Sequence, residues 1–136
     1  ADGLTGLRDA GEIAEGVYIT SAFLPDRPAP AAQQFVNAYL RRYDELPDHR
    51  GAMTYDAVYL LARALRDTGA ARTGIASMDD AARVRRAVRD YLASVGNETP
   101  AFEGVSGTIR FDENGDVTDK NVDVGVVRGG QLVTAS

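Results

Sequence analysis

Apolar residues recur every three or four positions in three segments of the chain, which is the spacing of one helix face. The pattern predicts helices over residues 31–43, 52–68 and 79–95. Ser77, followed three residues later by Asp80, predicts a cap for the third helix. Each helix has one apolar stripe that we expect to be buried. The stripes are Ala32, Phe35, Val36, Tyr39 and Tyr43; Thr54, Ala57, Val58, Leu61 and Leu65; and Val84, Val88, Tyr91, Leu92 and Val95.

The segment before these helices has the composition of a strand followed by an irregular connection. Its β-branched and aromatic run predicts a buried strand over residues 16–20. Three prolines predict an extended connection over residues 21–30, because a residue that precedes proline disfavours the helical conformation. A short helical turn is predicted over residues 4–10.

The segment after the helices has the pattern of a β-meander. Alternating apolar and polar residues predict a strand over residues 107–111, and further strands are predicted over residues 122–127 and 131–134. The Asn114-Gly115 and Gly129-Gly130 pairs predict tight turns, because these residues tolerate positive φ.

The order of elements indicates an α/β chain with a strand, three helices and a β-meander. Helices with apolar faces need a sheet or other helices to pack on. Because few strands are predicted between the helices, we expect the chain to be incomplete as a domain.

Composition excludes several classes of function. The 136 residues are enough for one domain, and the net charge of −5 argues against nucleic acid or an anionic membrane surface as the main partner. The chain has no cysteine, which excludes disulfides, thiolate catalysis and cysteine zinc sites. No apolar run approaches the roughly 20 residues of a membrane-spanning helix.

A search for catalytic and metal-binding motifs predicts neither an enzyme nor a metal or cofactor site. His49 is the only histidine, and beside Pro47 and Asp48 we expect it to be a solvated loop residue. Residues 104–108 resemble a nucleophile elbow but lack its final glycine. Residues 112–116 resemble a calcium loop but lack the required glycine and bidentate glutamate, so a hairpin turn is favoured.

Several segments in order resemble a known family. They are residues 14–20, the sequence Phe-Val-Asn-Ala-Tyr at 35–39, Pro47, Thr-Tyr-Asp-Ala-Val at 54–58, and the strand and turn at 107–116. This series resembles the C-terminal half of type I periplasmic binding proteins, the leucine/isoleucine/valine-binding family. The resemblance covers nearly the whole chain.

The resemblance implies a two-lobed α/β fold in which the solute binds between lobes that close over it. Residues 1–136 would form its C-terminal part. Residues 1–20 would end the second lobe, and residues 21–25 would cross to the first. Residues 26–115 would belong mainly to the first lobe, and residues 116–136 would make the last crossing and return to the second.

The resemblance also implies a function. We expect the chain to belong to the extracytoplasmic receptor of an ABC transporter, periplasmic or a cell-surface lipoprotein, which binds an amino acid or related small solute and delivers it to a permease. The alternative is the extracytoplasmic ligand-sensing domain of a bacterial signalling protein such as a receptor kinase.

Three residues match positions that contact ligand in the family. Asp2 lies where some members place an acidic residue against the ligand ammonium, but an exposed terminal residue is the favoured interpretation. Arg50 takes the place of an aromatic residue in leucine-binding members, which would favour a polar or acidic ligand; otherwise it is a solvated arginine at a helix start. Tyr55 could face the cleft, but its place near an apolar stripe favours the core.

The apolar stripes predict that the chain associates with itself. Large exposed apolar patches are uncommon on monomers and mark interfaces, and unpaired strand edges would add to the tendency to associate. We expect a homodimer, with collapse of the helices into a compact monomer as the alternative.

Overall fold

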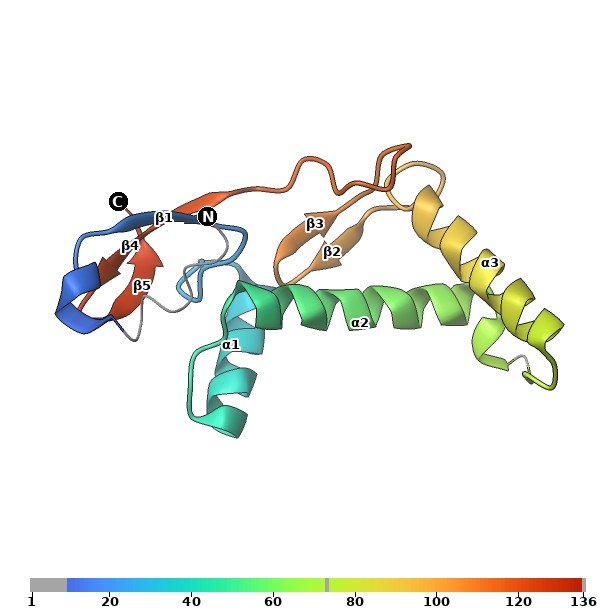
Figure 1. Ribbon diagram of the computed structural model, residues 1–136, viewed down its shortest axis with the longest axis horizontal. Helices are drawn as coiled ribbons and strands as arrows, with labels where there is room; N and C mark the ends of the chain where they lie inside the picture. Colours follow the sequence, from blue (N-terminus) through green and yellow to red (C-terminus); the bar gives the residue numbers. More distant parts are fainter. Residues whose placement is uncertain (1–9, 73, 136) are drawn as a thin grey trace. The chain divides into compact units, whose positions relative to one another are not determined.

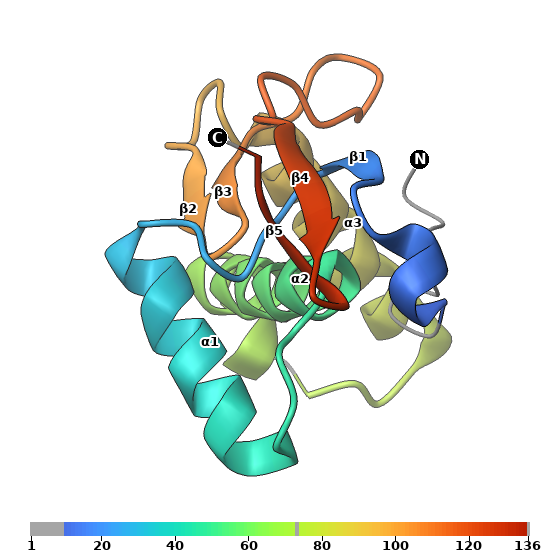
Figure 2. The same ribbon diagram turned by 90° about the vertical axis from the view of Figure 1, so that its left-hand side faces the viewer.

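The computed structural model describes residues 10–72 and 74–135 (Figures 1 and 2). The chain forms two compact units, one made of Ala1–Thr54 with Asn121–Ser136 and the other of Tyr55–Lys120. A strand, three helices and further strands follow one another along the chain, which confirms the α/β class. The predicted β-meander does not form one sheet, because Gly107–Ile109 pairs with Phe102–Gly104, a strand that the sequence pattern does not predict. Within the described part, every helix is too short or too polar to cross a membrane.

Three antiparallel strands form the sheet of the first unit, in the order β1-β4-β5 (Figure 2). β1 spans Tyr18–Ser21, β4 spans Asp123–Arg128 and β5 spans Gln131–Thr134. β1 ends opposite the start of β4, where Ser21 pairs with Asp123. The predicted crossing at residues 21–25 and the predicted last crossing at residues 116–136 therefore meet in this sheet at Ser21 and Asp123.

The core of the first unit lies around β4 and the connection that follows β1. Phe23 and Leu24 are almost fully buried in that connection. Gly125 in β4 is closely packed, because a Cβ atom there would lie 2.7 Å from Leu132 Cδ1 and the leucine side chain would have to shift. The other buried apolar residues of this unit are Ala14, Ala32, Phe35, Val36, Ala52, Val126 and Val127.

Helix α1 spans Pro30–Tyr43 and begins with a proline, whose fixed φ suits the first helical position. It ends at Asp44, which adopts the left-handed conformation and donates its N–H to the carbonyl of Leu40. The predicted apolar stripe is confirmed over its first half, where Ala32, Phe35 and Val36 are buried. Its last member, Tyr43, is 55% exposed.

Helix α2 spans His49–Asp67 and enters the second unit at Tyr55. A short 3-10 turn follows it over Ala70–Arg72. Helix α3 spans Met78–Ser94, and its predicted cap is confirmed because the Asp80 N–H donates to Ser77 Oγ at 3.1 Å.

A short hairpin completes the second unit. β2 spans Phe102–Gly104 and pairs antiparallel with β3, which spans Gly107–Ile109. Leu60 of α2, Val95 and Ile109 form the buried apolar cluster of this unit. The partly buried residues packed against that cluster are Tyr91, Leu92, Phe102 and Phe111.

The predicted strand over residues 16–20 and the predicted place of His49 are corrected. The strand predicted over residues 16–20 starts two residues later and is not buried, since β1 is an edge strand and Tyr18 is 66% exposed. His49, predicted in a loop, is the first residue of α2. A 3-10 turn lies over Gly11–Ala14, whereas the helical turn predicted over residues 4–10 falls outside the described residues except at its last position.

The predicted buried stripe of α2 is wrong. Val58 is 60% exposed and Leu61 is 45% exposed, whereas the fully or nearly fully buried positions of this helix are Ala52, Asp56, Leu60 and Ala64. The buried face includes a charged residue, so hydrophobicity alone selects the opposite face. The stripe of α3 is only half-buried, with Val84, Val88 and Leu92 all partly accessible.

Candidate functional site

The carboxylate of Asp56 is the centre of a buried polar cluster in the second unit. Asp56 is 1% exposed, and its Oδ1 accepts a hydrogen bond from the Val105 N–H at 2.8 Å. Its Oδ2 accepts the Ser106 N–H at 2.8 Å and the Ser106 hydroxyl at 2.5 Å. A buried charge is tolerated when hydrogen bonds of this kind replace water. One carboxylate therefore holds the turn between β2 and β3 on helix α2.

Lys120 extends the cluster at the end of the second unit. Its Nζ donates to Ser106 Oγ at 2.7 Å, and the Ser106 hydroxyl donates in turn to Asp56. A serine beside a lysine is also found in some hydrolases. Here the serine is 1% exposed and its proton points to a carboxylate, so the arrangement orients the turn and keeps the hydroxyl away from solvent.

Gly104 makes this close approach possible. A Cβ atom at residue 104 would lie 2.6 Å from Asp56 Oδ1, which is shorter than side chains tolerate. The glycine is thus required by the carboxylate beside it, since a strand residue with any side chain would displace α2 or the turn.

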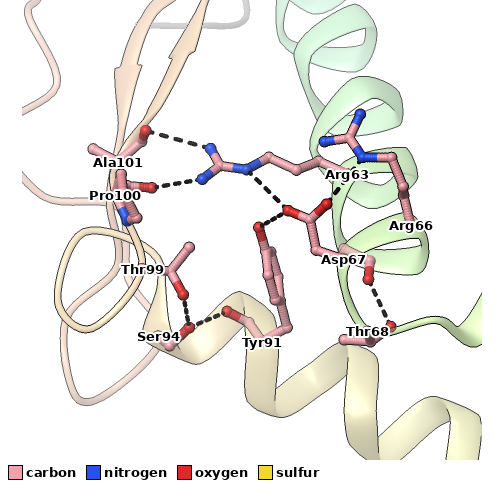
Figure 3. Close-up of polar contacts among 10 residues, drawn as sticks. Arg63, Arg66, Asp67, Thr68, Tyr91, Ser94, Thr99, Pro100 and Ala101 are labelled. Atoms are coloured by element: carbon pink, nitrogen blue, oxygen red, sulfur yellow. Dashed lines mark hydrogen bonds and ion pairs between the residues drawn. The ribbon is translucent and has the colours of Figure 1, made fainter.

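A second polar cluster lies at the other end of α2 (Figure 3). Arg63 donates to the carbonyls of Pro100 at 3.2 Å and Ala101 at 3.4 Å, and its Nε lies 3.7 Å from Asp67 Oδ2. The Tyr91 hydroxyl on α3 donates to the same carboxylate at 2.7 Å. These contacts join α2 to α3 and to the segment that leads into β2.

The contact between Asp67 and Tyr91 shifts the pKa of both side chains. The hydrogen bond from Tyr91, followed by the one from Arg66, lowers the pKa of Asp67 below its ordinary 3.8. Burial, and then the hydrogen bond to Asp67, raises the pKa of Tyr91 above 10.0. A lowered carboxyl pKa means that the contact stabilises the fold above pH 3.8 and that this stabilisation is lost as pH falls through the lowered pKa.

We expect Tyr91→Phe to raise the pKa of Asp67 toward its ordinary value, because the largest cause of the shift is removed. A carboxyl carbon NMR titration measures this directly. Tyr18→Phe, on an exposed strand residue of the other unit, is the control and should leave Asp67 unchanged. An Asp67 pKa that is the same in Tyr91→Phe and the unsubstituted chain would contradict the assignment.

The structure describes two of the three residues predicted to contact ligand. Asp2 lies outside the described residues. Arg50 is in the first turn of α2 and is exposed. Tyr55 is 38% exposed rather than in the core, so the preference for a core position is wrong. Positions five apart on a helix do not share a face, so Arg50 and Tyr55 are not neighbours on the surface of α2.

Tyr55 forms an aromatic pair with Tyr59 one turn along α2. The ring centroids are 4.6 Å apart, and Tyr59 is 54% exposed. A hydrogen bond to Tyr59, followed by burial, raises the pKa of Tyr55 above 10.0. The pair therefore offers an accessible aromatic surface.

The sequence search missed the Asp56 and Asp67 clusters because it looked for catalytic motifs. The signal that could have found the first is an aspartate among apolar residues on the long helix, together with Gly104 in the later hairpin. In the part of the chain that the structure describes, there is no group of three or more histidine, cysteine, aspartate or glutamate side chains that could hold a metal ion.

Comparison with known protein families gives a match over nearly the whole chain. The sequence profile described as periplasmic binding protein matches residues 3–131. No curated protein matches the chain.

Solved structures of transport proteins share the fold. A substrate-binding protein of an ABC transporter from Desulfitobacterium hafniense, in complex with Leu, is 32% identical over 90% of this chain, with a TM-score of 0.65. A leucine-binding protein from Thermotoga maritima is 29% identical over 93% of this chain, with a TM-score of 0.68.

A branched-chain amino acid transporter substrate-binding protein from Streptococcus pneumoniae, in complex with isoleucine, is 25% identical over 91% of this chain, with a TM-score of 0.65. The matched regions make up 32%, 31% and 32% of the Desulfitobacterium, Thermotoga and Streptococcus structures. This chain therefore spans about a third of their length.

Proposed function

The chain belongs to the periplasmic binding protein family, and from this premise we propose that it is part of an extracytoplasmic receptor for an amino acid or a related small solute. The observation that carries the proposal is the family match over residues 3–131, together with solved structures of about 30% identity that hold or are named for leucine. The proposed partner of the complete receptor is the permease of an ABC transporter.

The names of the similar structures favour transport over sensing. The Desulfitobacterium and Streptococcus structures are described as substrate-binding proteins of transporters, and the Thermotoga structure as a leucine-binding protein. None of these three is described as part of a signalling protein, so the sensor alternative has no support from them. An extracytoplasmic location follows from the same proposal.

We propose that the lobes divide as the resemblance implies, with residues 21–25 and 116–136 contributing two crossings. Two contacts between the segments support this division. Ser21 pairs with Asp123 in the sheet, and Arg27 forms an ion pair with Asp123 at 3.6 Å. The compact units divide instead at Thr54 and Lys120, so the lobe boundaries stay a prediction.

We propose that Asp2, Arg50 and Tyr55 contribute to the solute site of the complete receptor. Arg50 supports this best, since its guanidinium is exposed at the start of α2 and can take a carboxylate in two parallel hydrogen bonds. A solute with a second carboxylate or another polar side chain is therefore favoured over leucine.

The test uses a chimera in which residues 3–131 replace the matching third of the Desulfitobacterium protein. We expect Arg50→Phe to tighten leucine binding at least tenfold relative to glutamate in competition titrations, because an aliphatic side chain no longer has to desolvate a guanidinium. Arg41→Phe on α1, also exposed, is the matched control and should leave the preference unchanged. An unchanged preference in Arg50→Phe would contradict the role of this residue.

We also propose that the isolated chain forms a homodimer. Of the three apolar stripes that predict association, the stripe of α2 has exposed members in Val58 and Leu61, and the stripe of α3 is half-buried. Sedimentation velocity across a micromolar dilution series tests the proposal, and a single monomeric species at every concentration would contradict it.

A further inference from the structure

Tyrosines are the side chains of this chain that most readily lose a single electron. The chain contains six of them and neither cysteine nor tryptophan. A thiol would repair an oxidised tyrosine by giving up its hydrogen, and an indole would compete for the oxidant. Because the sequence has neither group, a one-electron oxidant acts on the tyrosines, and two tyrosines in contact can be joined.

Tyr55 and Tyr59 lie one turn apart on α2 and their rings are in contact. The ring centroids are 4.6 Å apart, the ring planes are inclined by 36°, and a hydrogen bond joins the two side chains. The ring carbons ortho to the two hydroxyls are close to each other because the hydroxyls themselves are. A bond between these carbons therefore needs rotation of the side chains rather than unfolding of the helix.

The pair lies on a side of α2 that solvent can reach. A helix turns 100° per residue, so Tyr55, Tyr59 and Arg66 share one side. Both tyrosines are more than a third exposed, and the side chain of Arg66 is 70% exposed. An oxidant in solution therefore has access to both rings.

We propose that Tyr55 and Tyr59 are a site of oxidative cross-linking, at which a haem peroxidase and hydrogen peroxide join the two rings ahead of the other tyrosines of the chain. The peroxidase takes one electron from each phenol, and each phenolic proton passes to water. The two phenoxyl radicals form one bond between ortho carbons. Each of these carbons then gives up its proton while each oxygen takes one back, which restores both phenols. The pair loses two hydrogen atoms in all, and these reduce one hydrogen peroxide to two waters.

A second tyrosine pair, on α1, has the same ring separation and provides a comparison within the chain. The ring centroids of Tyr39 and Tyr43 are also 4.6 Å apart. The Tyr39 side chain is hydrogen-bonded to Glu45, and the Arg42 guanidinium lies 5.7 Å from the centre of the Tyr43 ring. A cation over a ring is held by the electrons of that ring, so it opposes the loss of one of them. The pair on α1 should therefore couple more slowly than the pair on α2.

The experiment treats the 136-residue chain, at low micromolar concentration, with a haem peroxidase and hydrogen peroxide, and maps the products by mass spectrometry after trypsin digestion. Cleavage after Arg50 and Arg63 places both rings in one peptide, residues 51–63. We expect this peptide to lose two hydrogens and to give no fragments from cleavage of the backbone between the two tyrosines. Oxidation of Met53 in the same peptide adds oxygen instead, so the two products are distinguished by mass.

Tyr59→Phe keeps the ring but removes the hydroxyl, and it should abolish this bond because coupling needs two phenoxyl radicals. Tyr43→Phe is the matched control and should leave the yield unchanged. Circular dichroism of both variants checks that the helices persist. Coupling within one helix is intramolecular and should outpace encounters between chains. The proposal is overturned if residues 51–63 gain no such bond, if Tyr59→Phe still forms it, if the pair on α1 couples at least as fast, or if oxidation joins only separate chains.

Discussion

Asp56→Ala is expected to destabilise the second unit by about 3–5 kcal/mol, the usual cost of removing one partner from a buried charged network. The substitution leaves the N–H groups of Val105 and Ser106 without their acceptor in a buried place. It also removes the acceptor of the Ser106 hydroxyl, which is the link to Lys120. Because each unsatisfied buried donor costs about 1–3 kcal/mol, the turn should detach before the helices unfold.

Urea unfolding followed by circular dichroism measures the loss, and hydrogen exchange at Val105 and Ser106 shows where it occurs. Asp90→Ala is the matched control, because that carboxylate pairs with Arg89 on the surface and exposed ion pairs contribute about 0–1 kcal/mol. If Asp56→Ala were as stable to unfolding as Asp90→Ala, the buried cluster would contribute little to the stability of the second unit.

Gly104→Ala is expected to destabilise the chain by about 2–3 kcal/mol, at the upper end of what an added methyl group costs in a packed interior. The new Cβ would lie 2.6 Å from Asp56 Oδ1, so either the helix or the hairpin has to move. The movement would stretch the bonds that Asp56 accepts from the turn. The effect should therefore be smaller when the carboxylate is already absent.

The double variant Gly104→Ala with Asp56→Ala tests this coupling, since residues in contact do not have additive effects. Gly74→Ala is the control for the substitution itself, because a Cβ at that position meets nothing within 4 Å. The proposed crowding between Gly104 and Asp56 would be contradicted if Gly74→Ala and Gly104→Ala lost equal stability and the double variant lost the sum of its two single losses.

The helices could be predicted from the sequence because their spacing and caps are local features. The proline that opens α1 and the Ser77 cap of α3 fix two starts within a residue or two of those predicted. The start of α2 was less well predicted, since His49 lies among residues with loop character. The Asn114-Gly115 and Gly129-Gly130 turns were also local, and positive φ at Gly115, Gly129 and Gly130 agrees with them.

The sequence pattern could not predict which face of α2 is buried. Its apolar stripe through Val58 and Leu61 outweighs Leu60 and Ala64 in any count of hydrophobic residues. The face that is buried is instead selected by the hydrogen bonds that Asp56 accepts from a turn fifty residues away. Pairing over that separation leaves no trace in the periodicity of the helix itself.

The candidate solute site was predicted by resemblance only. The structure exposes Arg50 and Tyr55, which is compatible with contact to a partner or a solute. This chain spans about a third of the length of the similar structures, and the role of these residues in a solute site stays a prediction.

Calorimetric titration of the Desulfitobacterium chimera tests most directly whether these residues form part of a solute receptor. We expect saturable binding of one amino acid per chimera, with a solute that carries a polar or acidic side chain bound more tightly than leucine. A folded, monomeric chimera that binds no member of a panel of the common amino acids and related small carboxylates, while the unmodified Desulfitobacterium protein binds leucine under the same conditions, would contradict it.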